Sequence, residues 1–289
     1  MPQLRIGEAV GRGTVMTETL PAAYRARVRN DNWNNYSVLR HGAFDGMLVT
    51  SKNSGTHWLK YMLAIAIADT YGIARPTYFS ENAVRPYIGW PKDKPTHAQI
   101  PRLAFSHTIP HSLADWGWAR SLAKLPPYVL AIRHPMAILA SHHAKWEYDI
   151  QVDWLTYLKG DPAGKRYRCD IYWLARFWNR WGDVQAGAPG LILNIHYEDT
   201  LKDARAIIEA VAAHWSLNLA PEAIDAALAA GTKEEMAKRV DPQAEPNVLQ
   251  NRKTSLAELF SGDALDLYRK QVKTLFRHDL GYDLLNLPS

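Results

Sequence analysis

The segment LVTSKNSGTHWLKYML, residues 48–63, joins an apolar run to a helix-like stretch through a short polar sequence. At its centre, Ser54-Gly55-Thr56 stands where a strand is expected to end and a helix to begin. Free N–H groups at a helix N-terminus attract anions, and glycine lets the backbone approach a ligand closely. The hydroxyls add donors and Lys52 adds a full charge. The loop is therefore either an ordinary capped turn or a phosphate-binding loop.

Three further stretches carry residues suited to the same chemistry. Arg133 ends an apolar run and Ser141 follows eight residues later, so a guanidinium and a hydroxyl can surround a second phosphate. His107, in SHTIP, ends another apolar run, where an imidazole can take a proton from a hydroxyl. Arg252 and Lys253 follow a polar loop and can close over a phosphate as part of a lid. Each has an ordinary structural interpretation when taken alone, but together they describe a ligand with two separated anionic groups.

These residues follow short apolar runs that predict buried strands of a parallel sheet, at 47–50, 103–106, 128–133 and 191–196. Helical periodicity follows the first run up to Gly72, resumes at Pro135, and begins again after a cap at Asp199 or Thr200. The alternation predicts an α/β fold with a P-loop-like, doubly wound parallel sheet of four or five strands. Ligands of such sheets bind at the carboxyl ends of the strands. We expect residues 1–44 to be a loosely structured arm and 45–289 one domain.

Composition excludes several classes of protein. The chain has 289 residues, is 47% hydrophobic and 22% charged, and carries a formal net charge of +5. A single cysteine, Cys169, excludes a disulfide-built secreted domain and a cysteine-rich zinc site. Neither a signal-peptide core nor an apolar stretch of spanning length is present, so we expect a cytoplasmic protein without a membrane span. The mild basic excess fits an anionic ligand but not a nucleic-acid surface.

In chain order, these elements resemble the cytosolic-type sulfotransferases that use 3′-phosphoadenosine-5′-phosphosulfate (PAPS). The first loop of that family reads roughly T-Y-P-K-S-G-T-T-W, which aligns here with Thr50-Ser51-Lys52-Asn53-Ser54-Gly55-Thr56-His57-Trp58. Its 3′-phosphate element is matched by Arg133 and Ser141, and its catalytic histidine by His107. Further matches are Tyr197-Glu198-Asp199 for its Y-E-D segment, Arg252-Lys253 for its R-K-G element with Thr254 in place of the glycine, and residues 152–181 for its acceptor-side loop and helix. The resemblance covers about residues 46–280.

The resemblance implies a role for each matched residue. Lys52, Asn53, Ser54, Gly55, Thr56 and His57 would hold the 5′-phosphosulfate; Trp58 and Tyr197 would contact the adenine; Arg133, Ser141, Arg252 and Lys253 would hold the 3′-phosphate. His107 would be the general base, and Lys52, helped by Asn53, would stabilise the leaving oxygen. No metal is implied. In the ungapped alignment the lysine of the family's loop falls on Asn53, and Lys52 stands one place earlier.

The acceptor implied by the resemblance is a hydroxyl of a small molecule, a lipid or a glycan. Five tryptophans lie in or near the segments that flank the site by analogy, where they either form aromatic walls or belong to the core: Trp90, Trp116, Trp118, Trp146 and Trp154. A homodimer is compatible with the sequence.

Two other functions remain open. A kinase-type phosphotransferase would share the strand–loop–helix arrangement, although it should have a lysine directly before the loop Ser or Thr and an acidic Mg²⁺ ligand. A non-catalytic nucleotide-binding protein would keep the fold without transfer, and the shifted lysine keeps this alternative open.

Overall fold

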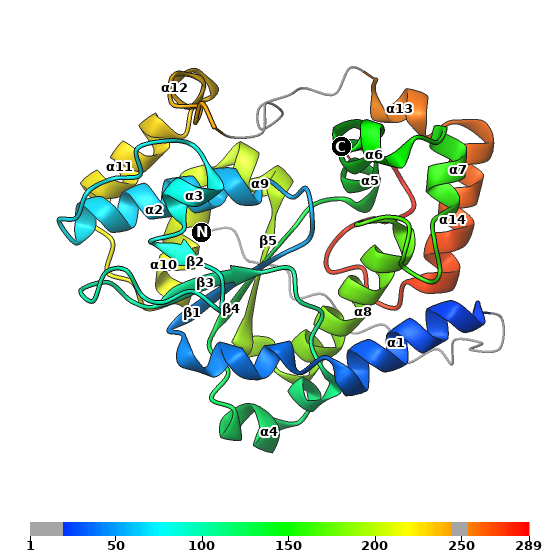
Figure 1. Ribbon diagram of the computed structural model, residues 1–289, viewed down its shortest axis with the longest axis horizontal. Coiled ribbons are helices and arrows are strands. Elements are labelled where there is room, and N and C mark those ends of the chain that lie inside the picture. The colour runs from blue at the N-terminus through cyan, green and yellow to red at the C-terminus, as the bar shows by residue number, and fades with distance from the viewer. Residues whose placement is uncertain (1–19, 244–253, 289) are drawn as a thin grey trace.

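Five parallel strands form the sheet at the centre of the computed structural model, which describes residues 20–243 and 254–288 (Figure 1). The strands are β1 (Gly46–Thr50), β2 (Ile88–Gly89), β3 (Leu103–Ser106), β4 (Tyr128–Ile132) and β5 (Ile192–His196), in the spatial order β2-β3-β1-β4-β5. Val49 pairs with Ser106, and Thr50 pairs with Ala131. The chain segments that follow β1, β3 and β4 therefore leave the sheet at one edge, side by side.

Helices connect the strands. They are α1 (Ala22–Asn34), α2 (Thr56–Thr70), α3 (Glu81–Val84), α4 (Gly117–Leu122), α5 (Pro135–Lys145), α6 (Glu147–Ile150), α7 (Trp154–Lys159), α8 (Ile171–Gly187), α9 (Tyr197–Lys202), α10 (Ala204–His214), α11 (Pro221–Ala230), α12 (Lys233–Lys238), α13 (Leu256–Leu259) and α14 (Gly262–Leu275), with 3₁₀ segments η2 (Tyr36–Ala43), η3 (Ser112–Asp115) and η4 (Pro189–Leu191). None of the helices in the described ranges is both long and apolar enough to cross a bilayer.

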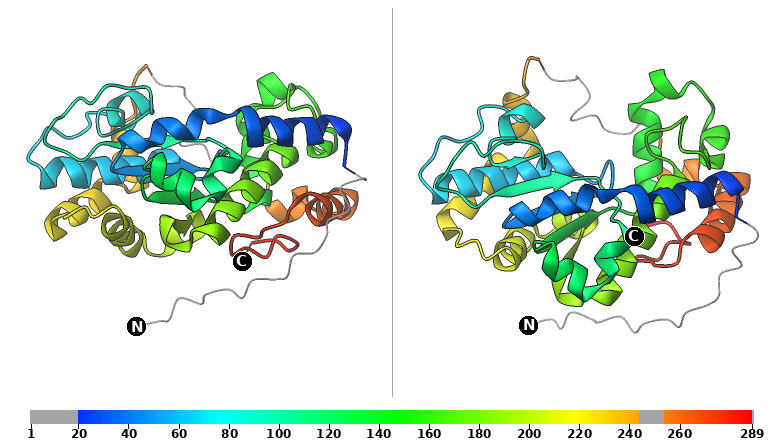
Figure 2. Two further views of the ribbon diagram at one scale, coloured as in Figure 1. Left: turned by 90° about the horizontal axis from the view of Figure 1, so that it is seen from below. Right: turned by 60° about the horizontal axis from the view of Figure 1, so that its bottom comes forward.

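The two faces of the sheet belong to two hydrophobic cores, because successive side chains of a strand point to opposite faces. Leu48 and Phe105 pack with α2, α10 and α11, whereas Met47 and Val49 pack with α5, α8 and α14. Figure 2 shows helices above and below the strands in two further orientations. This is the doubly wound arrangement that the sequence predicts, and it explains why each strand is a continuous apolar run.

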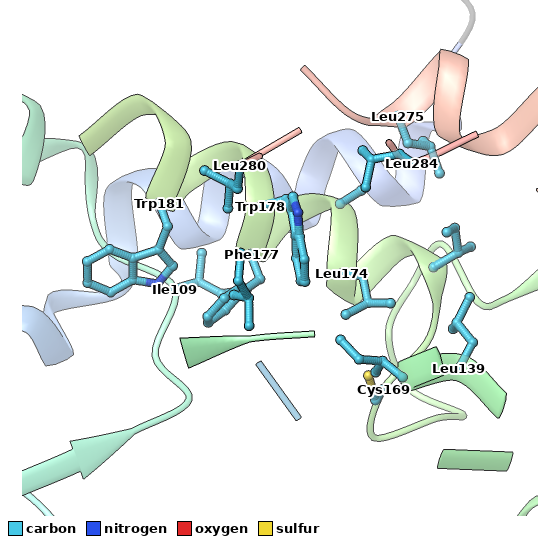
Figure 3. Close-up of a cluster of buried hydrophobic side chains, with 14 of the residues drawn as sticks. Ile109, Leu139, Cys169, Leu174, Phe177, Trp178, Trp181, Leu275, Leu280 and Leu284 are labelled. Atoms are coloured by element: carbon cyan, nitrogen blue, oxygen red, sulfur yellow. The ribbon is translucent and has the colours of Figure 1, made fainter. Parts of the chain in front are cut away.

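The larger core is built around α8. Trp178 and Trp181 project from this helix and are fully buried, together with Phe177 (Figure 3). Cys169, which lies just before α8, is also fully buried. Several of the tryptophans in the chain therefore serve packing.

The boundaries of the strands agree with the predicted apolar runs, with two differences elsewhere. Strand β2 was not predicted, because two residues are too few to give a period. The predicted helix cap at Asp199 or Thr200 is wrong: both lie inside α9, and Asp203 caps α10 by accepting a hydrogen bond from the N–H of Ala206.

The expectation of a loosely structured arm is wrong for its described part. Residues 22–43 form α1 and η2. Tyr24 is buried, and Asp31 forms a buried ion pair with Arg176 of α8. Contacts with residues far along the chain hold α1 in place, which sequence periodicity cannot show. The division into residues 1–44 and 45–289 stays a prediction.

Candidate functional site

The loop between β1 and α2 turns through two residues in the left-handed region, Asn53 at φ +56° and Gly55 at φ +71°. Gly55 is also packed against Tyr197, since a Cβ added to it would lie 2.4 Å from Cε2 of that ring. No side chain caps α2, so the N–H groups of its first turn face the loop without a capping oxygen. This geometry favours an anion in the loop.

Replacing Gly55 by alanine should destabilise the protein more than the same change at Gly72. Gly72 also has positive φ, +64°, but a Cβ there would meet nothing within 4 Å. Gly72→Ala should therefore cost only the backbone strain, about 1–2 kcal/mol. Gly55→Ala should add the overlap with Tyr197, at least about 1 kcal/mol more. Urea unfolding followed by circular dichroism measures both changes, and equal losses would show that Tyr197 moves aside freely.

Thr50 links the loop to His107. The Thr56 hydroxyl donates to Oγ1 of Thr50 at 2.9 Å, and Nδ1 of His107 donates to the Thr50 carbonyl oxygen at 2.8 Å. Nδ1 also lies 3.1 Å from Oγ1 of Thr50, but its shorter contact is to the carbonyl oxygen, which only accepts, so we assign the proton to Nδ1. The other ring nitrogen, Nε2, then has its lone pair available to accept a proton.

The surroundings of His107 keep the imidazole neutral. Its ring meets those of Phe105 and Trp90 edge to face, with centroids 5.9 Å and 6.5 Å away. Burial, reinforced by nearby cations that include Lys52, lowers the pKa of His107 to about 4. A neutral imidazole with a free Nε2 is the form required of a general base at pH 7.

Lys52 and Asn53 differ in how their side chains are engaged. Nζ of Lys52 donates to the carbonyl oxygen of Arg168 and lies 4.7 Å from the ring centroid of Trp173. Burial lowers the pKa of this ammonium. Nδ2 of Asn53 is buried and has no hydrogen-bond partner in the described part of the chain. Asn53 therefore presents an unused donor inside the loop, whereas Lys52 is already bound.

Arg133 follows β4 directly and reaches the same loop. Its Nη1 donates to the carbonyl oxygen of Asn53 at 3.4 Å, and its guanidinium carbon lies 4.6 Å from the ring centroid of Tyr197. Nε of Arg133 is buried, with no partner among residues 20–243 and 254–288. Tyr197 in turn meets Trp58 edge to face at 6.3 Å, and Nε1 of Trp58 donates to the carbonyl of Gly231. Along the border of the loop, Arg133 thus contacts Tyr197, and Tyr197 contacts Trp58.

A largely buried ion pair stabilises the helix that follows the loop. Lys60 has no exposed surface and binds Glu81 at 2.7 Å, while its Nζ lies 3.3 Å from the ring centroid of Phe105. Burial lowers the pKa of Lys60 to about 8. Nδ1 of His57 lies 3.3 Å from the same carboxylate. Glu81 therefore ties the first turns of α2 to α3.

The predicted site residues fall into three groups. Contacts join the loop residues, His107, Arg133, Tyr197 and Trp58 into one site. Ser141 is half-buried on α5, and within the described part of the chain its side chain stands apart from this network of contacts. Arg252 and Lys253 lie outside the described residues.

The five tryptophans considered for the acceptor side lie in different parts of the structure. Trp116, between η3 and α4, and Trp118 of α4 stack with ring centroids 5.8 Å apart. Both precede β4 in the chain and so lie toward the amino end of that strand, whereas the loop follows the carboxyl end of β1. Trp154 donates to the carbonyl of Leu259. Trp90 and Trp146 are half-buried, and Trp90 is near His107.

Two cavities of about 330 Å³ each lie beside Trp90. One is bordered by residues before β1 and β3, and the other by η2 and Ser106. Neither of these two cavities is lined by the loop after β1. The loop site is defined by the contacts between its side chains. Within the described ranges, no three His, Cys, Asp or Glu side chains come together in a group that could hold a metal ion.

Sequence reasoning missed Lys60 and underused Thr50. Lys60 follows the predicted site residue Thr56 by four positions and so shares its helix face. That spacing was a readable signal. Thr50 stood in the aligned loop, but its bond to His107 is visible only in the fold.

Comparisons with solved structures identify the fold. No protein-family model matches the sequence, and no curated protein matches it either. The structure of retinol dehydratase in complex with retinol and PAP aligns with a TM-score of 0.50 and 16% identity, covering 90% of this chain and 88% of that one. The structure of mouse sulfotransferase SULT7A1 complexed with PAP aligns with a TM-score of 0.46 and 14% identity, covering 82% and 89%. The chain thus has the α/β fold of retinol dehydratase, with a parallel sheet between two layers of helices.

Proposed function

We propose that the protein is a PAPS-dependent sulfotransferase, which moves a sulfuryl group to a hydroxyl of a small-molecule, lipid or glycan acceptor. One observation carries the proposal: His107 is hydrogen-bonded to Thr50, and Thr50 is in turn hydrogen-bonded to Thr56 of the loop after β1. A structure that shares the fold was determined with PAP, adenosine 3′,5′-bisphosphate, which supports a nucleotide of this kind.

The residues of the site fit the charges of PAPS. Asn53 Nδ2 and Arg133 Nε are buried donors without partners in the described ranges. The resemblance assigns Asn53 to the 5′-phosphosulfate and Arg133 to the 3′-phosphate. The loop hydroxyls and first-turn N–H groups of α2 would hold the 5′-phosphosulfate. Arg133 and Ser141 would hold the 3′-phosphate, and Trp58 with Tyr197 would border the adenine.

PAPS supplies an activated sulfuryl group, and the phosphate of PAP is the leaving group. His107 Nε2 takes the proton of the acceptor hydroxyl as the new S–O bond forms and the bond to the bridging oxygen breaks. Asn53 Nδ2 and the loop N–H groups donate to that bridging oxygen as negative charge develops on it. Lys52 adds a fixed positive charge nearby, held by Arg168 and Trp173.

Calorimetric binding of PAP without magnesium tests the cosubstrate site. Wild type should bind, and Arg133→Ala should weaken binding by about tenfold to a few hundredfold, because charge-assisted bonds to a phosphate are lost. Arg205→Ala is the matched control, since Arg205 forms exposed ion pairs on α10. Absence of PAP binding to wild type would refute the proposal.

A transfer assay separates the sulfotransferase from the two alternatives. Turnover of PAPS in EDTA supports it, whereas magnesium-dependent transfer from ATP supports a kinase-type enzyme. A non-catalytic nucleotide-binding protein would bind PAP tightly without transferring a group. This last alternative is tested because the Lys52 ammonium is already hydrogen-bonded to the Arg168 carbonyl.

A further inference from the structure

Two cations lie against one tryptophan at the end of α5. Nζ of Lys145 is 5.4 Å from the ring centroid of Trp146, and the guanidinium carbon of Arg168 is 4.4 Å from it. Lys145 ends α5, whereas Arg168 lies in the segment between α7 and α8. Attraction between a cation and an aromatic face orients both side chains around the ring. We call Lys145, Trp146 and Arg168 the cationic rim.

The cationic rim adjoins the candidate site. Lys145 follows Ser141 by four residues and shares its helix face. The carbonyl of Arg168 accepts the hydrogen bond from Lys52. Burial lowers the pKa of His57 to about 4, and the positive charges of Lys60 and Lys145 add to this effect.

Glu147 and Asp149 of α6 closely follow the rim tryptophan and are the acidic residues nearest to it in the sequence. In the part of the chain that the structure describes, Lys145 has no carboxylate within 4.0 Å. Arg168 has Asp149 at 3.9 Å, but the two side chains are 68% and 47% exposed, so water screens the pair. The segment 165–168, Lys-Arg-Tyr-Arg, adds further positive charge. The rim is therefore able to bind an additional anion.

In the proposed function the phosphates of the cosubstrate have other partners. The loop and α2 would hold the 5′ side, and Arg133 with Ser141 would hold the 3′ side. We propose that the cationic rim binds the acceptor, and that the acceptor is a hydroxyl compound carrying an oxyanion group, such as a carboxylate or sulfate. This inference rests on the proposed function and narrows its acceptor class. In it, Lys145 and Arg168 are specificity-determining residues, and Trp146 positions them.

Acceptor pairs that differ by one charge test the inference. The pairs are 4-methylphenol with 4-hydroxybenzoate, glucose with glucuronate, and galactose with galactose 6-sulfate. Wild type should prefer the anionic member of at least one pair by about tenfold in kcat/KM. Lys145→Gln and Arg168→Gln should each reduce that preference about fivefold, mainly through KM, and leave turnover of the neutral member unchanged. Lys165→Gln, which removes an exposed cation from the same segment, should leave the preference intact.

Calorimetry with PAP separates the failure of this inference from failure of the proposed function. PAP affinity should stay within about twofold of wild type in both rim variants. A large loss of PAP affinity would assign the rim to the cosubstrate and overturn the inference while supporting the PAPS site. Equal rates for charged and neutral acceptors, or no turnover of any pair, would overturn the acceptor class even where PAP binds normally. Absence of PAP binding to wild type would instead overturn the proposed function.

Discussion

Replacement of His107 by alanine is expected to lower kcat for sulfuryl transfer by at least about a hundredfold. The expectation rests on the hydrogen bond from Nδ1 to the Thr50 carbonyl, which leaves the lone pair of Nε2 available. The affinity for PAP should change little, because in the proposed function the loop and Arg133 hold the phosphates. Steady-state kinetics with PAPS and calorimetry with PAP measure the two effects separately.

His107→Asn separates a base from a structural hydrogen bond. An asparagine amide can donate to the Thr50 carbonyl in place of Nδ1, but it has no basic nitrogen. If His107 only holds the end of β3 to β1, the asparagine variant should recover the rate. If His107 is the base, both variants should be equally slow, which is the result we expect.

The pH dependence of the wild-type enzyme provides a second readout of His107. Burial and the nearby cations disfavour the imidazolium, so its pKa falls to about 4 and the basic form is present above that pH. We expect kcat/KM for PAPS, which reports the free enzyme, to rise through about pH 4 and to level off near pH 5. A limb centred at about 6.5, the ordinary value for histidine, would mean that the imidazole is solvated.

The strands and the strand-end residues could be predicted from sequence because both signals are local. A parallel strand covered on two faces is a continuous apolar run, and the residue after it lies at the edge where ligands bind. His107 after β3 and Arg133 after β4 followed from this rule. The rule gives position only, so it could not show that His107 is bound to Thr50.

What could not be predicted depends on contacts between distant parts of the chain. The apolar residues of helix α1 do not gather on one face, and Asp31 reaches an arginine 145 positions away. The direction of Lys52 is set in the same way, because its partner Arg168 comes from the segment before α8. The resemblance assigns Lys52, helped by Asn53, to the leaving oxygen. The fold shows that the Lys52 ammonium is bound to the Arg168 carbonyl and that the Asn53 amide has no partner in the described ranges.

Asn53→Gly is therefore expected to lower kcat about a hundredfold, as the loss of one preorganised donor to the leaving oxygen does elsewhere. Glycine is the informative replacement, because Asn53 has φ +56° and glycine keeps that conformation without strain. Asn53→Asp should be slower still, since it replaces the donor with a negative charge beside an anion. Single-turnover measurements with saturating PAPS isolate this step from binding.

Lys52→Met is the comparison for Asn53→Gly. Methionine keeps the packing against Trp173 but removes the ammonium that binds the Arg168 carbonyl. Because this ammonium already has a partner, we expect its loss to slow transfer by about tenfold, less than the loss of the Asn53 amide. A hundredfold loss in Lys52→Met with near-normal turnover in Asn53→Gly would reverse the assignment. It would mean that Lys52 leaves the Arg168 carbonyl and reaches the leaving oxygen when PAPS binds.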